Sequence, residues 1–204
     1  ASGSNPGIAI EAVDTLVSGF EITGDDNTVA GISIRTSNGA TQDITLRNNV
    51  VSGITGAGGG GDVDVSFGIL SFGTSKLQNL TVENNVIEDV GQTEVPGFGM
   101  QLEEIDSASV LDNIVRNMKG TASDDNGNTI ENYGIGIQPL DDNSVPGGEF
   151  PANAEVLDNI IKNAAVGIVR GDTDNPGSSS ISGNTFDNVE TNTRSISSGG
   201  SSGN

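Results

Sequence analysis

The chain has 204 residues, which suits one domain with a sizeable core and is too short for two domains of ordinary size. Eight basic residues against 28 acidic ones give a formal net charge of −20, which argues against binding to nucleic acid or to an anionic membrane surface. The chain contains no cysteine and no histidine, so disulfides, thiolate chemistry and histidine-based catalysis are excluded. No apolar run approaches the roughly 20 residues of a spanning helix, and we expect no membrane insertion.

The first recurring element is a glycine followed by alternating apolar residues. Alternation over so short a stretch predicts a β-strand rather than a helix. Successive copies begin 24 to 37 residues apart. The six copies are Gly7–Ile10, Gly31–Ile34, Gly68–Ser71, Gly99–Leu102, Gly134–Ile137 and Gly167–Arg170.

A second element follows each glycine element and carries an asparagine. Its copies are Leu46–Val51, Val82–Ile87, Val110–Val115, Val156–Ile161 and a weaker Ile181–Phe186. In the first repeat Phe20 stands in the asparagine position. Identical amides stacked at strand spacing can hydrogen-bond along the stack, so we expect a structural ladder; a ligand-binding role is the alternative. The predicted ladder comprises Asn49, Asn85, Asn113, Asn159 and Asn184.

Equivalent strands of successive repeats bury their apolar faces by stacking into parallel sheets around a common axis, and variable spacing then reflects loop insertions at the corners. The predicted class is therefore all-β. From Gly7 to Val189 the two motifs resemble the right-handed parallel β-helix, or pectin-lyase-like, superfamily. The resemblance implies a right-handed solenoid of about six to seven coils. We expect one domain over residues 1–194, followed by a Gly/Ser-rich tail over residues 195–204.

Aromatic residues precede three of the repeated glycines, namely Phe67, Phe98 and Tyr133. Strand parity predicts that the first and third residues after each glycine point inward, and it assigns the residue before the glycine to the same side. We therefore expect a buried aromatic stack in the central core. An aromatic platform for sugars is the alternative.

Pairs of acidic residues are frequent, and two carboxylates at a suitable separation can hydrolyse a glycosidic bond. The resemblance implies that hydrolases would carry clustered aspartates with a histidine, and that lyases would carry basic residues, often with calcium. The chain matches neither pattern, so no catalytic residue is assigned and an enzymatic role stays open.

Oxygen-rich loops suit calcium, the one cofactor that the sequence suggests. The candidate ligands are Asp124, Asp125, Asp172 and Asp174. Neither loop fits the EF-hand frame, and solvated turn acids are the alternative interpretation.

An outward-facing surface is predicted along the glycine strands. It would bind a neutral glycan through Arg35, Phe72, Gln101, Glu103 and Gln138, as ligands of the resembled superfamily commonly lie across such a face. The alternative is an ordinary solvated sheet face with a cross-strand Glu11–Arg35 pair.

The sequence begins Ala1–Ser4 without an initiator methionine or a basic-apolar leader, which fits a mature secreted protein after signal removal; an artificially trimmed chain is the alternative. The two ends of the predicted stack expose unpaired strands, so we expect end-to-end contact with other copies or contact with an extracellular glycan. The favoured hypothesis is a non-catalytic structural or interaction protein, secreted or on the cell surface, acting in adhesion or filament formation. The alternative is a carbohydrate-active enzyme, a polysaccharide lyase or glycoside hydrolase, acting on extracellular polysaccharide.

Overall fold

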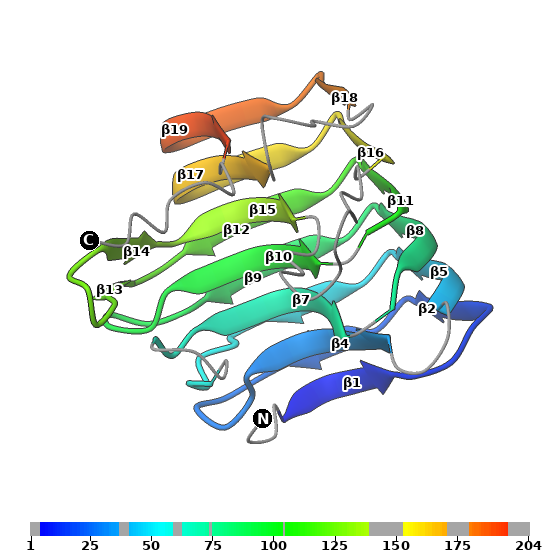
Figure 1. Cartoon of the computed structure of the whole chain (residues 1–204), viewed down its shortest axis with the longest axis horizontal. Helices are drawn as coiled ribbons and strands as arrows, with labels where there is room; N and C mark the ends of the chain where they lie inside the picture. Colours follow the sequence, from blue (N-terminus) through cyan, green and yellow to red (C-terminus); the bar gives the residue numbers. More distant parts are fainter. Residues whose placement is uncertain are drawn as a thin grey trace, which may run out of the picture.

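The computed structural model describes residues 5–36, 41–58, 63–73, 75–103, 105–138, 153–170 and 180–195. Within these ranges the protein is all-β, with no α-helix, and hence no helix that could span a membrane. The strands stack from β1, blue in Figure 1, to β19, red in the same view.

Three kinds of strand recur in the same order along the chain. The glycine strands are β1 (Pro6–Ile10), β4 (Ala30–Thr36), β7 (Ser66–Gly73), β10 (Gly97–Glu103), β15 (Tyr133–Gln138) and the second half of β17 (Ile160–Arg170). The second strands are β2 (Thr15–Ser18), β5 (Thr41–Arg47), β8 (Leu77–Glu83), β11 (Ser107–Leu111), β16 (Asn153–Leu157) and β18 (Ser180–Ser182). The third strands are β3 (Glu21–Thr23), β6 (Val50–Ser52), β9 (Val86–Val90), β12 (Ile114–Met118), the first half of β17 and the first half of β19 (Thr185–Ser195).

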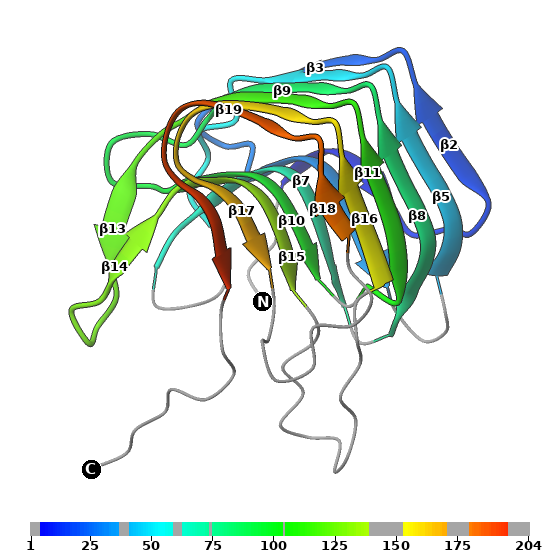
Figure 2. The ribbon, with the colours of Figure 1, turned by 90° about the horizontal axis from the view of Figure 1, so that it is seen from above.

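Each strand pairs in parallel with its counterpart in the next repeat. The second strands form a sheet in the order β18-β16-β11-β8-β5-β2, and the other two kinds share a larger sheet that is continuous through β17. The register aligns like with like: Ile32 pairs with Ile69, and Val82 pairs with Val110. Figure 2 shows three columns of strands that curl around a nearly closed interior. The architecture is solenoid-like.

One insertion interrupts this parallel pattern with an antiparallel hairpin, β13 (Thr121–Ser123) and β14 (Thr129–Glu131). It lies between β12 and β15 along the chain and projects to one side of the stack in Figure 2. Its base is closed by Asn132 Nδ2, which donates to the Gly120 carbonyl at 2.9 Å. It is tied to the large sheet because the Ala165 N–H on β17 donates to Asn132 Oδ1 at 2.9 Å and Arg194 on β19 pairs with Glu131.

The central core is filled by the alternating residues of all three strand types. The first residue after each repeated glycine lies in it, as do most of the third residues. Those in the first position are Ile8, partly buried, then Ile32, Ile69, Met100, Ile135 and Ile168. The second strands contribute residues such as Leu46 and Val82, and the third strands contribute Val51 and Ile87, all of them fully buried.

The aromatic residues before the glycines do not belong to this core, which corrects the expectation from parity. Phe67, Phe98 and Tyr133 form a separate apolar cluster with Leu70 and Val169, on the outer face of the glycine strands. The Phe98 and Tyr133 rings stack with their centroids 4.0 Å apart, and the centroids of Phe67 and Phe98 lie 5.6 Å apart with the rings edge to face.

The repeated glycine explains why the inward–outward alternation of side chains does not extend to the residue before it. A Cβ on Gly68 would meet Ile87 Cγ2 at 2.4 Å, and a Cβ on Gly99 would meet Val115 Cγ1 at 2.4 Å, so the glycine position faces the core. The following residue also faces the core, so two consecutive positions point inward and the residue before the glycine is turned outward. The third strands approach too closely for any side chain at these glycines.

Candidate functional site

The five repeated asparagines form a continuous column at the turn between the second and third strands, and all but the partly exposed Asn184 are buried. In each step the backbone N–H and the side-chain Nδ2 of one asparagine donate to the Oδ1 of the next. The Nδ2–Oδ1 distances are 3.0 Å from Asn49 to Asn85, from Asn85 to Asn113, from Asn113 to Asn159 and from Asn159 to Asn184. Each Nδ2 also donates to a backbone carbonyl one strand back, as Asn113 does to Val82 at 2.8 Å. This column satisfies the turn backbone, and Phe20 N–H ends it by donating to Asn49 Oδ1 at 3.0 Å.

The residue before each ladder asparagine takes a left-handed backbone conformation, which asparagine, aspartate and glycine tolerate best. These residues are Asn48, Asn84, Asp112, Asp158 and Gly183, with φ between 53° and 69°. The Asn-Asn and Asp-Asn pairs of the sequence therefore combine a turn residue with a ladder residue.

Sequence reasoning missed a second column, four residues after the first and exposed to solvent. Asn163 Nδ2 donates to Asn117 Oδ1 at 2.8 Å, and Asn188 Nδ2 donates to Asn163 Oδ1 at 2.9 Å. Asp89 holds the equivalent position and pairs with Lys119 at 2.8 Å. The constant offset of four residues from the ladder asparagines is the signal that would have identified this column.

The predicted ligand face divides into two small groups. Near one end Arg35 lies over the Phe72 ring, with its Cζ 5.1 Å from the ring centroid, and its Nη1 is 3.6 Å from Glu11 Oε1. Further along, Gln101 Nε2 donates to Glu103 Oε1 at 2.8 Å. The backbone of Gln138 pairs with Glu103, and its side chain lies outside the described atoms.

The outer face is less solvated than an ordinary sheet surface. Ser33, Leu70 and Gln101 occupy equivalent positions on β4, β7 and β10, and all three are buried. Burial raises the pKa of the Glu103 carboxyl above its usual range, and the hydrogen bond from Gln101 opposes this in part. Burial also raises the pKa of Tyr133 well above its usual value, and the negative charge of Glu103 adds to the effect.

The candidate calcium ligands are not brought together in the described residues. Asp124 Oδ1 accepts hydrogen bonds from the backbone N–H groups of Asn126 and Asn128 at 2.9 and 2.7 Å, and Asp124 Oδ2 accepts one from Asn128 Nδ2 at 2.8 Å. These bonds lower the pKa of Asp124 and close the tip of the hairpin. Asp125 lies exposed at the same tip, and Asp172 and Asp174 fall outside the described residues. The part of the chain that the structure describes contains no cluster of three acidic residues able to hold a metal ion.

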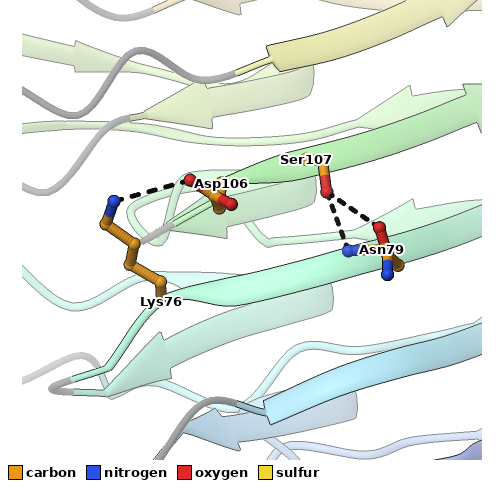
Figure 3. A network of polar contacts seen from close by, with 4 residues as sticks. All are labelled: Lys76, Asn79, Asp106 and Ser107. Atoms are coloured by element: carbon orange, nitrogen blue, oxygen red, sulfur yellow. Dashed lines mark hydrogen bonds and ion pairs between the residues drawn. The ribbon is translucent and has the colours of Figure 1, made fainter.

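An open groove of about 370 Å³ runs across β8, β11 and β16 and is lined by both polar and apolar residues. At its edge the Asn79 N–H donates to Ser107 Oγ at 2.9 Å, and Ser107 Oγ donates to Asn79 Oδ1 at 3.2 Å (Figure 3). Nearby, Lys76 Nζ lies 3.5 Å from Asp106 Oδ1. These contacts link neighbouring strands. In them the polar groups of Asn79, Ser107, Lys76 and Asp106 bind one another.

No family model, no curated protein and no solved structure matches the chain.

Proposed function

We propose that the chain is a right-handed parallel β-helix of about six to seven coils, of the kind found in the pectin-lyase-like superfamily. The parallel pairing of like residues, repeat after repeat, supports this assignment, as does the ladder of buried amides. Both features are what stacked coils of a single winding require.

We propose further that the protein is an extracellular structural or interaction protein that contacts other copies of itself end to end. The observation that carries this proposal is the distribution of exposed large apolar side chains. Among the described residues these are Val13, Leu16 and Phe20, with exposed fractions of 47%, 56% and 53%. All three lie in the first repeat: Val13 precedes β2, Leu16 lies within β2, and Phe20 stands between β2 and β3. The strands β1, β2 and β3 each have a strand partner on one side only. Exposed apolar groups beside unpaired strands favour association.

Sedimentation velocity at about 0.1 M and about 1 M NaCl tests this proposal, because the net charge of −20 opposes association until salt screens it. We expect larger species at the higher salt concentration. The double variant Leu16→Thr/Phe20→Ser should abolish them, whereas Leu111→Thr, on the outer face of β11 in the middle of the stack, should leave them unchanged. A monomer at both salt concentrations would contradict the proposal.

A carbohydrate-active enzyme is the second candidate, and Glu103 is the observation that favours it. A partly buried carboxyl with a raised pKa is what a general acid needs in glycoside hydrolysis. A panel of plant, algal and microbial polysaccharides, incubated with and without calcium, tests this candidate. Turnover that Glu103→Gln abolishes would favour the enzyme over the structural protein.

A further inference from the structure

Two buried polar atoms of the described residues have no hydrogen-bond partner, namely Gln101 Oε1 and Tyr133 Oη. Their side chains belong to residues that are only 5% and 7% exposed. A buried polar group without a partner destabilises the folded state, so two such groups on the same face of the sheet indicate a missing partner.

The two atoms lie on adjacent strands of the outer face. Gln101 on β10 pairs in register with Gly136 on β15. The Tyr133 ring lies against Gly136, because a Cβ built there would be 2.6 Å from Tyr133 Cε2 and 3.0 Å from Tyr133 Oη. A side chain at position 136 would therefore displace the Tyr133 ring, and the glycine leaves room for this ring over β15 at the register position that pairs with Gln101.

Glu103 adds a negative charge to the same place. Its Oε1 accepts the hydrogen bond from Gln101 Nε2, and its charge is felt by the Tyr133 hydroxyl. No ion pair in the described part of the chain reaches Glu103. Six of the eight cations of the chain pair with other carboxylates: Arg35, Lys76, Arg116, Lys119, Lys162 and Arg194.

We propose that Gln101, Glu103 and Tyr133 form a binding site for a ligand with a primary ammonium group. The ammonium has three N–H donors, and the site offers three oxygen acceptors on the Gln101 amide, the Glu103 carboxylate and the Tyr133 hydroxyl. The positive charge neutralises Glu103, which a neutral hydroxyl group cannot do. Aromatic rings at Phe98 and Tyr133 favour a cation nearby, and the net charge of −20 concentrates cations at the surface.

The chain supplies its own reporter for this site. Tyr133 is the sole tyrosine and there is no tryptophan, so tyrosine emission comes from the site alone. Ethylammonium chloride titrated at pH 7 and constant ionic strength should give a saturable change in this emission. Glu103→Gln should weaken the affinity at least about tenfold, because hydrogen bonds to charged groups are the strong ones. Glu155→Gln, which changes an exposed glutamate on β16, should leave the affinity unchanged.

Three further titrations separate the alternatives. Tetramethylammonium carries the charge without N–H donors and should bind at least about tenfold more weakly; equal binding would overturn the role of the three acceptors. A saturable change with calcium chloride or with glucose, and none with ethylammonium, would overturn the proposal and would identify the site as a metal site or a sugar site. No saturable change with any probe would show that water satisfies the two atoms and would refute the proposal. Gln101→Leu, with circular dichroism as a check on folding, should also weaken ethylammonium binding.

Discussion

Replacing Asn113 by alanine removes the central residue of the asparagine ladder, and the structure allows the effect to be worked out bond by bond. Asn113 is fully buried. Its Oδ1 accepts hydrogen bonds from the backbone N–H and the Nδ2 of Asn85 at 2.9 and 3.0 Å, and its Nδ2 donates to Val82 and to Asn159. Alanine leaves the Asn85 backbone N–H without an acceptor and takes a donor from the Val82 carbonyl, whereas Asn85 Nδ2 keeps the Leu46 and Glu83 carbonyls at 2.9 and 3.1 Å. At about 1–3 kcal/mol for each of the two buried groups that lose a partner, we expect a loss of about 3–5 kcal/mol of unfolding free energy.

Asn184→Ala is the matched control at the end of the same ladder. Asn184 accepts the equivalent two hydrogen bonds from Asn159, at 2.9 and 3.0 Å, but its own side chain is partly exposed. Water can therefore replace its oxygen, and we expect a loss of about 1 kcal/mol.

Urea unfolding followed by circular dichroism measures both variants. With a slope of about 2–3 kcal/mol per molar urea, Asn113→Ala should lower the midpoint by about 1.5 M. An unchanged slope is needed for the comparison, because repeat proteins can lose cooperativity when one coil is weakened. Equal losses for the two variants, or a loss below about 1 kcal/mol for Asn113→Ala, would refute the burial argument.

Three further predictions follow from the outer face and the glycine strands. Gly99→Ala should destabilise the protein by about 2–3 kcal/mol in urea unfolding, because its Cβ would lie 2.4 Å from both the Gly134 carbonyl oxygen and Val115 Cγ1. Gly127→Ala meets no atom within 4 Å and strains only a left-handed φ of 80°, so about 1 kcal/mol is expected and a larger loss than for Gly99→Ala would be contradictory. The raised pKa of Glu103 means that its protonated form favours the folded state, a contribution that is present below the unfolded pKa and lost as pH rises through the folded pKa. Glu103→Gln should therefore have a higher urea midpoint than the unchanged chain at neutral pH, and the two midpoints should converge in acid. An equal increase in midpoint at all pH values would exclude the Glu103 charge as the cause of the increase. Finally, an alkaline absorbance titration should find the pKa of Tyr133 well above 10 in the folded protein and lower in Glu103→Gln than in the unchanged chain; ionisation near 10 would show that the ring is solvated.

The strands and the ladder were accessible from the sequence because each depends on short-range patterns. Alternation after the glycines locates the glycine strands, and the spacing of Asn85 and Asn113 within identical motifs places them in one column. Both follow from the two-residue period of a strand and from the stacking of equal turns.

Short-range patterns do not predict on which side of the sheet the aromatic residues lie. Parity assumes that side chains alternate without interruption through Gly68 and Gly99, yet these glycines face the core together with the residues that follow them. Only the close approach of Ile87 and Val115, which belong to distant third strands, reveals the shift.

The same shift hid part of the candidate site. Parity predicts Gln101 and Glu103 on the outer face but Tyr133 in the interior, so it does not place the three residues together. The unpaired oxygen atoms depend on side-chain positions across two strands, and no spacing in the sequence encodes them.

The central claim is that equivalent strands stack in register, so that the distance along the stack grows by one strand spacing with each coil. Spin labels on single cysteines, introduced in pairs into a chain without native cysteine, measure this distance directly. Leu16, Thr45, Thr81, Ser109, Glu155 and Ser180 occupy one register column, each paired with the next. At about 4.8 Å per strand, labels at Leu16 and Glu155 should lie about 19 Å apart, and labels at Leu16 and Ser180 about 24 Å apart. A Leu16–Ser180 distance no longer than the Leu16–Glu155 distance would contradict the stacked arrangement.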